Sequence, residues 1–260
     1  MSDAEHTRRL ARQHAETSRL LGVDFVPLKP VQLGPSDGGA MIEAKPSNAL
    51  RSSVMKDREE TERLMTELRA RYEADAPHDS FVTDHHSIVW GDGDVCADLM
   101  FVGEAPGAEE DKQGKPFVGR SGQLLDKMIT ALGLSRPQVY IANVLKTRPP
   151  NNATPTQDEM EACRPYLLEQ IAIVNPSAIV TLGRPAAQCL LSTNEAMGRL
   201  RGHWSSLEIA TGALGTVSFP VMPTYHPAYV LRNYTADTRG KVWSDLLQAA
   251  EKLGLDIPTR

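Results

Sequence analysis

Four short, almost wholly apolar runs, each followed by glycine or polar residues, limit what most of this chain can fold into. They span residues 98–103, 139–144, 178–182 and 219–224. Helical patterns occupy residues 122–132, 157–174, 185–191 and 238–253, between and after these runs. Short continuous apolar runs are typical of buried parallel strands. Since such strands alternate with helices, we expect an α/β fold over residues 81–260, a three-layer α/β/α sandwich with a short central parallel sheet.

Residues 1–80 differ in composition from the rest of the chain. Residues 2–21 and 56–74 carry charge-rich helical patterns, and residues 33–48 between them have the glycine, proline and serine content of a linker. We therefore expect an N-terminal extension, helical and partly disordered.

Composition narrows the class of protein. No apolar run approaches the roughly 18 residues of a membrane span, and no secretory leader is visible. We therefore expect a cytoplasmic protein without membrane contact. Cys96, Cys163 and Cys189 lack any C-x-x-C spacing, which disfavours a disulfide framework and a zinc site. The net charge of −5 does not favour nucleic-acid binding through the field of the whole molecule, but it is compatible with a local basic groove.

Polar clusters follow the predicted strands. Glu104 lies on the glycine-flanked turn "GEAPG", Asn143 ends the second run, and the segments beginning at Lys146 and Tyr225 are rich in polar residues and proline. Ligands of parallel α/β folds bind beyond the carboxyl ends of the strands. The sequence therefore places a candidate site there.

The segments "GEAPGAEEDKQGKPFVGRSG", "NVLKTRPPNNATPT" and "HPAYVLR", in this order and each after a strand, resemble the uracil-DNA glycosylase superfamily, most closely its family 4. The resemblance covers roughly residues 89–253. It implies a DNA repair enzyme that hydrolyses the N-glycosidic bond of uracil in DNA and leaves an abasic site. That chemistry requires no metal, and we expect a monomer without a cofactor. Whether other deaminated bases are also excised stays open. One alternative is a catalytically degenerate member that only binds nucleic acid. A weaker one is hydrolysis of free nucleosides, which a duplex-wedging "AYVLR" segment argues against.

The resemblance also implies roles for individual residues. Glu104 orients or polarises the attacking water, while the backbone at Gly103 and Ala105 approaches the base. Phe117 stacks on the extruded base, Asn143 reads its edge, and His226 donates a hydrogen bond to uracil O2 as charge develops. The structural alternatives are a turn cap for Glu104, a core aromatic for Phe117, a strand-end turn residue for Asn143 and a structural histidine for His226.

A DNA-contacting set is implied as well. It comprises Lys146, Arg148, Pro227, Ala228, Tyr229 and Arg232, the last four in a loop that enters the duplex. A surface role for the basic residues, and a helix-starting loop for the segment from His226, are the alternatives.

The chain departs from family 4 in its cysteines. Relatives of this type typically hold a four-iron, four-sulfur cluster on four cysteines, but Thr147 stands at one of those positions, and only Cys163 matches another. One thiolate cannot hold such a cluster, so we expect none, with the N-terminal extension as a candidate substitute for its tethering. A different metal at Asp84, His85 and His86 is a minor alternative.

Overall fold

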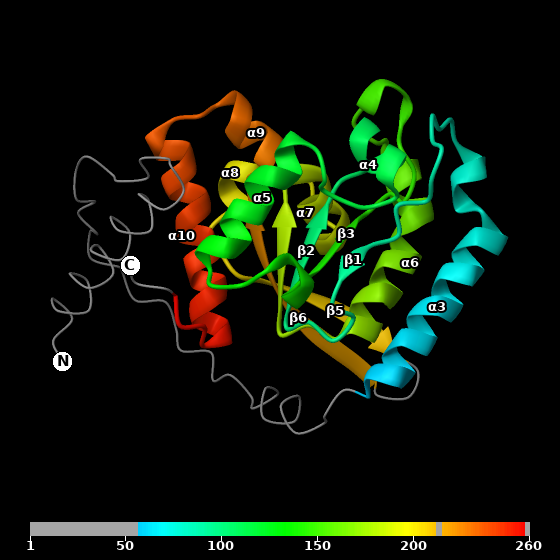
Figure 1. The fold of residues 1–260 in the computed structure, drawn as a ribbon, viewed down its shortest axis with the longest axis horizontal. Coiled ribbons are helices and arrows are strands. Elements are labelled where there is room, and N and C mark those ends of the chain that lie inside the picture. The colour runs from blue at the N-terminus through cyan, green and yellow to red at the C-terminus, as the bar shows by residue number, and fades with distance from the viewer. Residues whose placement is uncertain (1–56, 212–214, 258–260) are drawn as a thin grey trace, which may run out of the picture.

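The structure, a computed structural model, describes residues 57–211 and 215–257 (Figure 1). The strands in these ranges are β1 (Asp92–Gly93), β2 (Leu99–Gly103), β3 (Tyr140–Asn143), β4 (Ala178–Leu182), β5 (Ser205–Thr211) and β6 (Gly215–Thr224). The α-helices are α3 (Arg58–Asp75), α4 (Ala108–Gln113), α5 (Arg120–Ala131), α6 (Gln157–Val174), α7 (Arg184–Leu191), α8 (Met197–Leu200), α9 (Pro227–Arg232) and α10 (Ala236–Leu253). Short 3-10 turns lie at Pro77–Ser80, Arg136–Gln138 and Pro150–Asn152.

The strands form one sheet in the order β1-β3-β2-β4-β6-β5. The four inner strands pair in parallel, while β1 and β5 add antiparallel edges. The register sets Gly103 of β2 opposite Asn143 of β3. The turn after β2 and the end of β3 therefore begin side by side.

Two apolar cores cover the two faces of the sheet, which confirms the predicted sandwich. Successive side chains of a strand point to opposite faces, so Met100 packs with α3, α6 and α7, whereas Phe101 packs with α5, α9 and α10. In Figure 1, α5 and α10 lie on one side of the sheet, with α6 and α3 on the other. The site forms at the edge where β2 and β4 end.

Local signals explain where the principal helices start. Thr156 caps α6, where its hydroxyl accepts from the Glu159 amide and the Glu159 carboxylate accepts from the Thr156 amide, a reciprocal capping box. Thr235 caps α10 in the same position of its helix. Both helices match the predicted segments to within two residues, because cap and apolar pattern agree.

The helix α3 lies N-terminal to the expected domain boundary and packs against the sheet. The helix predicted at residues 56–74 is present as α3, but its buried Met65, Leu68 and Tyr72 belong to the same apolar core as the sheet. The helix α3 thus contributes to the core on one face of the sheet, and the domain boundary expected at residue 80 stays a prediction. The helix expected at residues 2–21, and the disorder expected around it, lie outside the described residues.

Two further expectations need correction. Edge strands β1 and β5 were not predicted, and the segment after His226 is the short helix α9 rather than an open loop. Among the helices of residues 57–257, none is both long and apolar enough to cross a membrane.

Candidate active site

A cavity of about 900 Å³ opens at the carboxyl ends of the inner strands. Its walls come from the turn after β2, the loop before α5, the end of β3, the start of α7 and the segment entering α9. Among the predicted residues, it is lined by Glu104, Ala105, Phe117, Asn143, His226, Ala228, Tyr229 and Arg232. The fold thus brings together most of the set that the sequence nominated.

Gly103 brings the Phe117 ring and the Asn143 amide together. A Cβ atom on Gly103 would lie 2.5 Å from Cζ of Phe117 and closer still to Oδ1 of Asn143. Any side chain there would displace one of these two buried groups. The ring of Phe117 and the amide of Asn143 therefore meet over a position that only glycine leaves open.

Asn143 is 1% exposed, yet neither its Oδ1 nor its Nδ2 has a hydrogen-bond partner in the described residues. A buried amide without partners costs free energy, on the order of 1–3 kcal/mol per unpaired group. Such a group at the wall of a cavity is suited to a ligand that supplies one donor and one acceptor side by side.

Lys146 does not lie where the sequence predicted. It is 0% exposed, and its ammonium donates to the Asn143 carbonyl at 2.7 Å and to Oε1 of Gln170. Burial lowers the pKa of Lys146 to about 7. Because the ammonium is buried and hydrogen-bonded inside the protein, Lys146 stabilises the end of β3 and is not placed to contact a phosphate.

His226 is the N-cap of α9. Its Nδ1 accepts a hydrogen bond from the Ala228 amide at 3.0 Å, so the ring proton resides on Nε2. The ring lies 5.5 Å from that of Phe117, centroid to centroid. Burial, reinforced by the Arg232 charge, lowers the pKa of His226 to about 4. The imidazole is consequently neutral at neutral pH and leaves an Nε2–H free to donate.

Glu104 follows β2 directly, and its carbonyl accepts from the Leu145 amide at 3.1 Å, which fixes the turn to the exit of β3. Burial raises the pKa of the Glu104 carboxyl, while the Thr154 hydroxyl and the Arg184 charge act in the opposite direction. Neither Thr154 nor Arg184 was singled out from the sequence. Arg184 lies two residues after the predicted strand at 178–182, and that position was the available signal.

Two acids that follow Glu104 bind backbone amides. Glu110 accepts from the amides of Val118 and Gly119 through Oε1. Asp111 is 0% exposed and accepts from the amides of His86 and Ser87. Glu110 thus fixes the backbone before α5 at the cavity wall, and Asp111 fixes the segment before β1.

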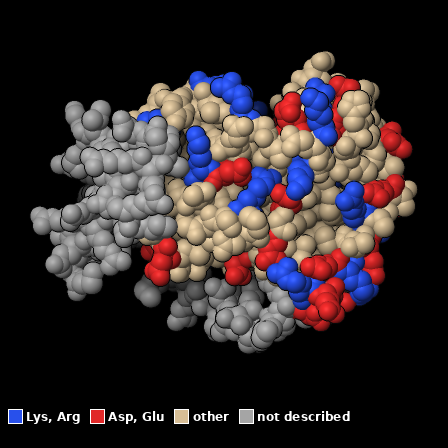
Figure 2. Space-filling model, in the orientation of Figure 1, with Lys and Arg blue, Asp and Glu red and all other residues tan. Residues whose placement is uncertain are grey.

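The predicted DNA-contacting residues divide into two groups. Ala228, Tyr229 and Arg232 line the mouth of the cavity, with Tyr229 39% exposed. Pro227 is buried at the start of α9, and Arg148 is paired with Asp84 at 3.4 Å and with Oδ1 of Asn152. Figure 2 shows Lys and Arg side chains over the end of the molecule that carries α9, despite the net charge of −5.

Comparison with known proteins agrees with this geometry. The sequence profile of the uracil DNA glycosylase superfamily matches residues 90–247. The chain belongs to this superfamily. This member is 42% identical over 164 residues to a type-4 uracil-DNA glycosylase of Thermotoga maritima, covering 63% of this chain and 81% of the relative. It is 44% identical over 158 residues to a type-4 enzyme of Pyrobaculum aerophilum, covering 60% and 78%. A type-5 uracil-DNA glycosylase of the same organism is 32% identical over 151 residues, covering 52% and 63%.

The donors of this superfamily member do not fit an iron-sulfur cluster. Cys163 is buried, which raises the pKa of its thiol, and the groups beside it are the Tyr72 phenol and the Lys146 amine. Thr147 offers a hydroxyl where a thiolate would be needed. Within residues 57–211 and 215–257, no group of three or more His, Cys, Asp or Glu side chains is placed to hold a metal ion, which includes the stretch around His85 and His86.

Proposed function

We propose that this chain is a uracil-DNA glycosylase of base excision repair, which hydrolyses the N-glycosidic bond of uracil in DNA and leaves an abasic site. Its membership of the superfamily and its similarity to type-4 uracil-DNA glycosylases support this activity. The observation that carries it in the structure is the buried, unpartnered amide of Asn143 beside the Phe117 ring.

The Asn143 amide matches the edge of uracil. Its Oδ1 accepts from uracil N3–H and its Nδ2 donates to O4, whereas cytosine presents the opposite pattern of donor and acceptor. A good bidentate pair of this kind discriminates between bases by about 1–3 kcal/mol. The Phe117 ring provides the stacking face for a base taken out of the helix.

The remaining groups support the chemistry. As the bond between C1′ and N1 breaks, its electron pair passes to uracil, and the Nε2–H of His226 donates to O2 where the negative charge gathers. Glu104, ionised above its raised pKa, orients the water whose oxygen forms the new bond to C1′, and its carboxylate accepts the proton that this water loses. Because the proton of the neutral His226 ring is on Nε2, this nitrogen can donate to uracil O2 while the ring carries no charge.

Contacts with the DNA strand around the uracil would come from residues at the mouth of the cavity. Tyr229 and Arg232 of α9 are exposed there and are positioned for the strand flanking the extruded nucleotide. The monomeric state and cytoplasmic location expected from the sequence stay predictions, and size-exclusion chromatography with light scattering tests the first.

The main alternative is a member of the superfamily that binds DNA without cleaving it. The test incubates the protein with oligonucleotides carrying one uracil or one cytosine at the same position, followed by alkali, which breaks the strand at abasic sites. Binding is measured in parallel, and Glu104→Gln serves as the matched control for chemistry. We expect cleavage of the uracil oligonucleotide by wild-type protein, a much lower rate of the same cleavage by the variant, and no cleavage of the cytosine oligonucleotide, with binding kept in the variant. Binding without alkali-labile sites in the wild type would establish the alternative.

A further inference from the structure

The loop that carries Phe117 is held in an unusual backbone conformation. Phe117 has a φ of 51°, in the left-handed region that residues other than glycine seldom adopt. A conformation of this kind costs on the order of 1 kcal/mol and persists only where surrounding contacts fix it. The contacts that fix this loop therefore determine where the Phe117 ring lies.

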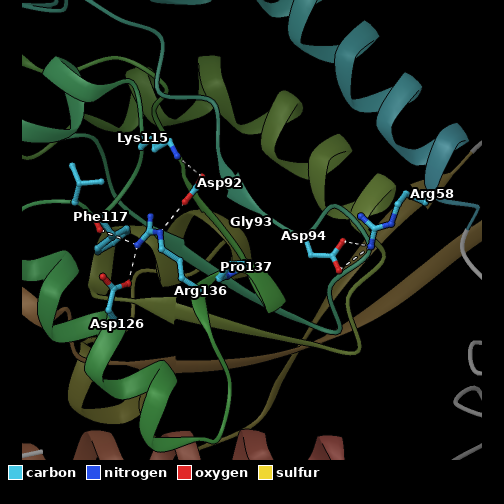
Figure 3. A pocket seen from close by; sticks show the side chains of 10 residues that line it. Arg58, Asp92, Gly93, Asp94, Lys115, Phe117, Asp126, Arg136 and Pro137 are labelled. Carbon is cyan, nitrogen blue, oxygen red and sulfur yellow. Dashed lines mark hydrogen bonds and ion pairs between the residues drawn. The ribbon is translucent and has the colours of Figure 1, made fainter.

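Arg136 holds the carbonyl side of the loop. Its guanidinium donates to the Phe117 carbonyl at 3.0 Å and to the Pro116 carbonyl. The same group is anchored by Asp92 at 2.8 Å and Asp126 at 3.0 Å. Figure 3 shows the guanidinium between these two carboxylates, facing the backbone of Phe117.

Glu110 holds the amide side of the same loop. Its Oε1 accepts from Val118 N–H at 2.9 Å and from Gly119 N–H at 2.8 Å. Space is provided by Gly122 in the first turn of α5, where a Cβ atom would overlap the Phe117 carbonyl. A cation thus binds two successive carbonyls and an anion binds two successive amides, and the Phe117 side chain is directed toward His226 and Asn143.

Arg136 itself is not part of the proposed base pocket. It lines a separate cavity of about 700 Å³ behind the loop, together with Asp92, Asp94 and Arg58 (Figure 3). Among the residues that line this second cavity, only Phe117 also lines the base pocket. The Phe117 loop is therefore the direct link between Arg136 and a base bound in the pocket.

We propose that Arg136 is a positioning residue that sets the stacking ring of Phe117 over the base, with Glu110 as its counterpart on the amide side. This inference rests on the proposed function, because it assigns Arg136 an influence on uracil excision. Arg136 acts through the conformation of the loop and touches neither substrate nor the reacting atoms.

A double-mutant cycle tests the proposal, because it measures whether two residues act through one another. Single-turnover excision of uracil is measured for wild type, Arg136→Gln, Phe117→Ala and the double variant, with melting temperatures recorded for all four. We expect Arg136→Gln to slow excision about tenfold in the wild-type background and to have no further effect on the rate once Phe117 is alanine. An equal loss in both backgrounds would make Arg136 a general stabilising residue and would overturn the proposal, as would a rate equal to wild type.

Arg58→Gln is the matched control, since it removes an ion pair with Asp94 in the same cavity without touching the loop, and its rate should equal wild type. If Arg136→Gln does not fold, Arg136→Lys enters the same cycle, since an ammonium cannot reproduce the planar fork of donors.

A readout independent of activity separates this proposal from the proposed function. The Phe117 ring shifts the NMR resonances of the His226 ring protons, because the two rings lie 5.5 Å apart. Arg136→Gln should change these resonances when Phe117 is present and leave them unchanged in Phe117→Ala. If the wild type excised no uracil, the proposed function would fail, and this measurement would still decide whether Arg136 positions Phe117. Unchanged resonances in Arg136→Gln would overturn the inference.

Discussion

At the scale of single residues, burial shifts the pKa values of the two titratable groups of the site so that each stays in its uncharged form over a wider pH range. Burial lowers the pKa of His226 and raises that of Glu104. His226 is therefore neutral at neutral pH, which suits the proposed donor to uracil O2, while Glu104 is a better proton acceptor than an exposed carboxylate. Asn143 contributes through the absence of partners for its buried amide.

Replacing His226 tests the donor to uracil O2. His226→Ala should slow excision by roughly 10²–10³, because a prepositioned donor acts mainly in the transition state. Its affinity for uracil-containing duplex should stay close to that of wild type, as judged by binding measured alongside single-turnover rates. A variant as fast as wild type would remove His226 from the mechanism.

The depressed pKa of His226 also predicts a pH dependence of stability. Between pH 6.5, the ordinary value, and about 4, the unfolded chain binds a proton that the folded site does not. Stability due to this group is therefore present above pH 6.5 and is lost as the pH falls toward 4. Denaturant unfolding across this range should show a shallower decline for His226→Gln than for wild type, and parallel curves would contradict the assignment.

The raised pKa of Glu104 predicts that the excision rate falls at acid pH. Its pKa is raised, so the carboxylate is lost at a higher pH than for an exposed glutamate, whereas His226 stays neutral down to about pH 4. The logarithm of the single-turnover rate should fall as the pH drops through the Glu104 pKa. In Glu104→Gln the residual rate should lack that decrease, and a decrease that persists would assign it to another group.

At the scale of elements, the helix α3 was predicted, but its packing into the core of the sheet was not. Tyr72 is 0% exposed, and its ring lies 5.4 Å from that of His78, 5.5 Å from Trp90 and 5.1 Å from Tyr166. Its hydroxyl is next to Cys163 and Thr147. The Tyr72 side chain of α3 thus lies beside Cys163 and Thr147, the two positions that the sequence compared with cluster ligands. This packing supports the expected tethering by the N-terminal region.

Because Tyr72 is fully buried, its removal should lower the free energy of unfolding strongly. Tyr72→Ala should cost about 3 kcal/mol or more and lower the Tm by roughly 10 °C, since it leaves a cavity among packed rings. Leu64→Ala on the exposed side of α3 is the matched control and should shift the Tm little. Similar shifts for the two variants in thermal melts would show that α3 does not tether the domain through Tyr72.

At the scale of the whole molecule, the sequence predicted the inner sheet because β2, β3, β4 and the end of β6 are continuous apolar runs. It missed β5, whose buried Leu207 and Ile209 alternate with exposed Glu208 and Ala210, a period-2 signal that a search for continuous runs passes over.

Lys146 and Arg136 could not have been placed from the sequence, because their partners are distant in the chain. Lys146 reaches Gln170 on α6, and Arg136 reaches Asp92 and Asp126. Loop position suggested a surface lysine, and only tertiary packing turned it inward. The residues bordering the cavity were better predicted, since all but Gly103 among the expected substrate and catalytic set line it directly.

The proposed function depends most on Asn143, whose amide we propose reads the edge of uracil. The most direct test is single-turnover excision of uracil by wild type and by Asn143→Asp, a variant of the same shape that cannot donate to O4. We expect alkali-labile sites with wild type and a rate roughly 5- to 150-fold lower for the variant, from a loss of about 1–3 kcal/mol. Absence of excision by wild type, or equal rates for the two proteins, would contradict the proposal.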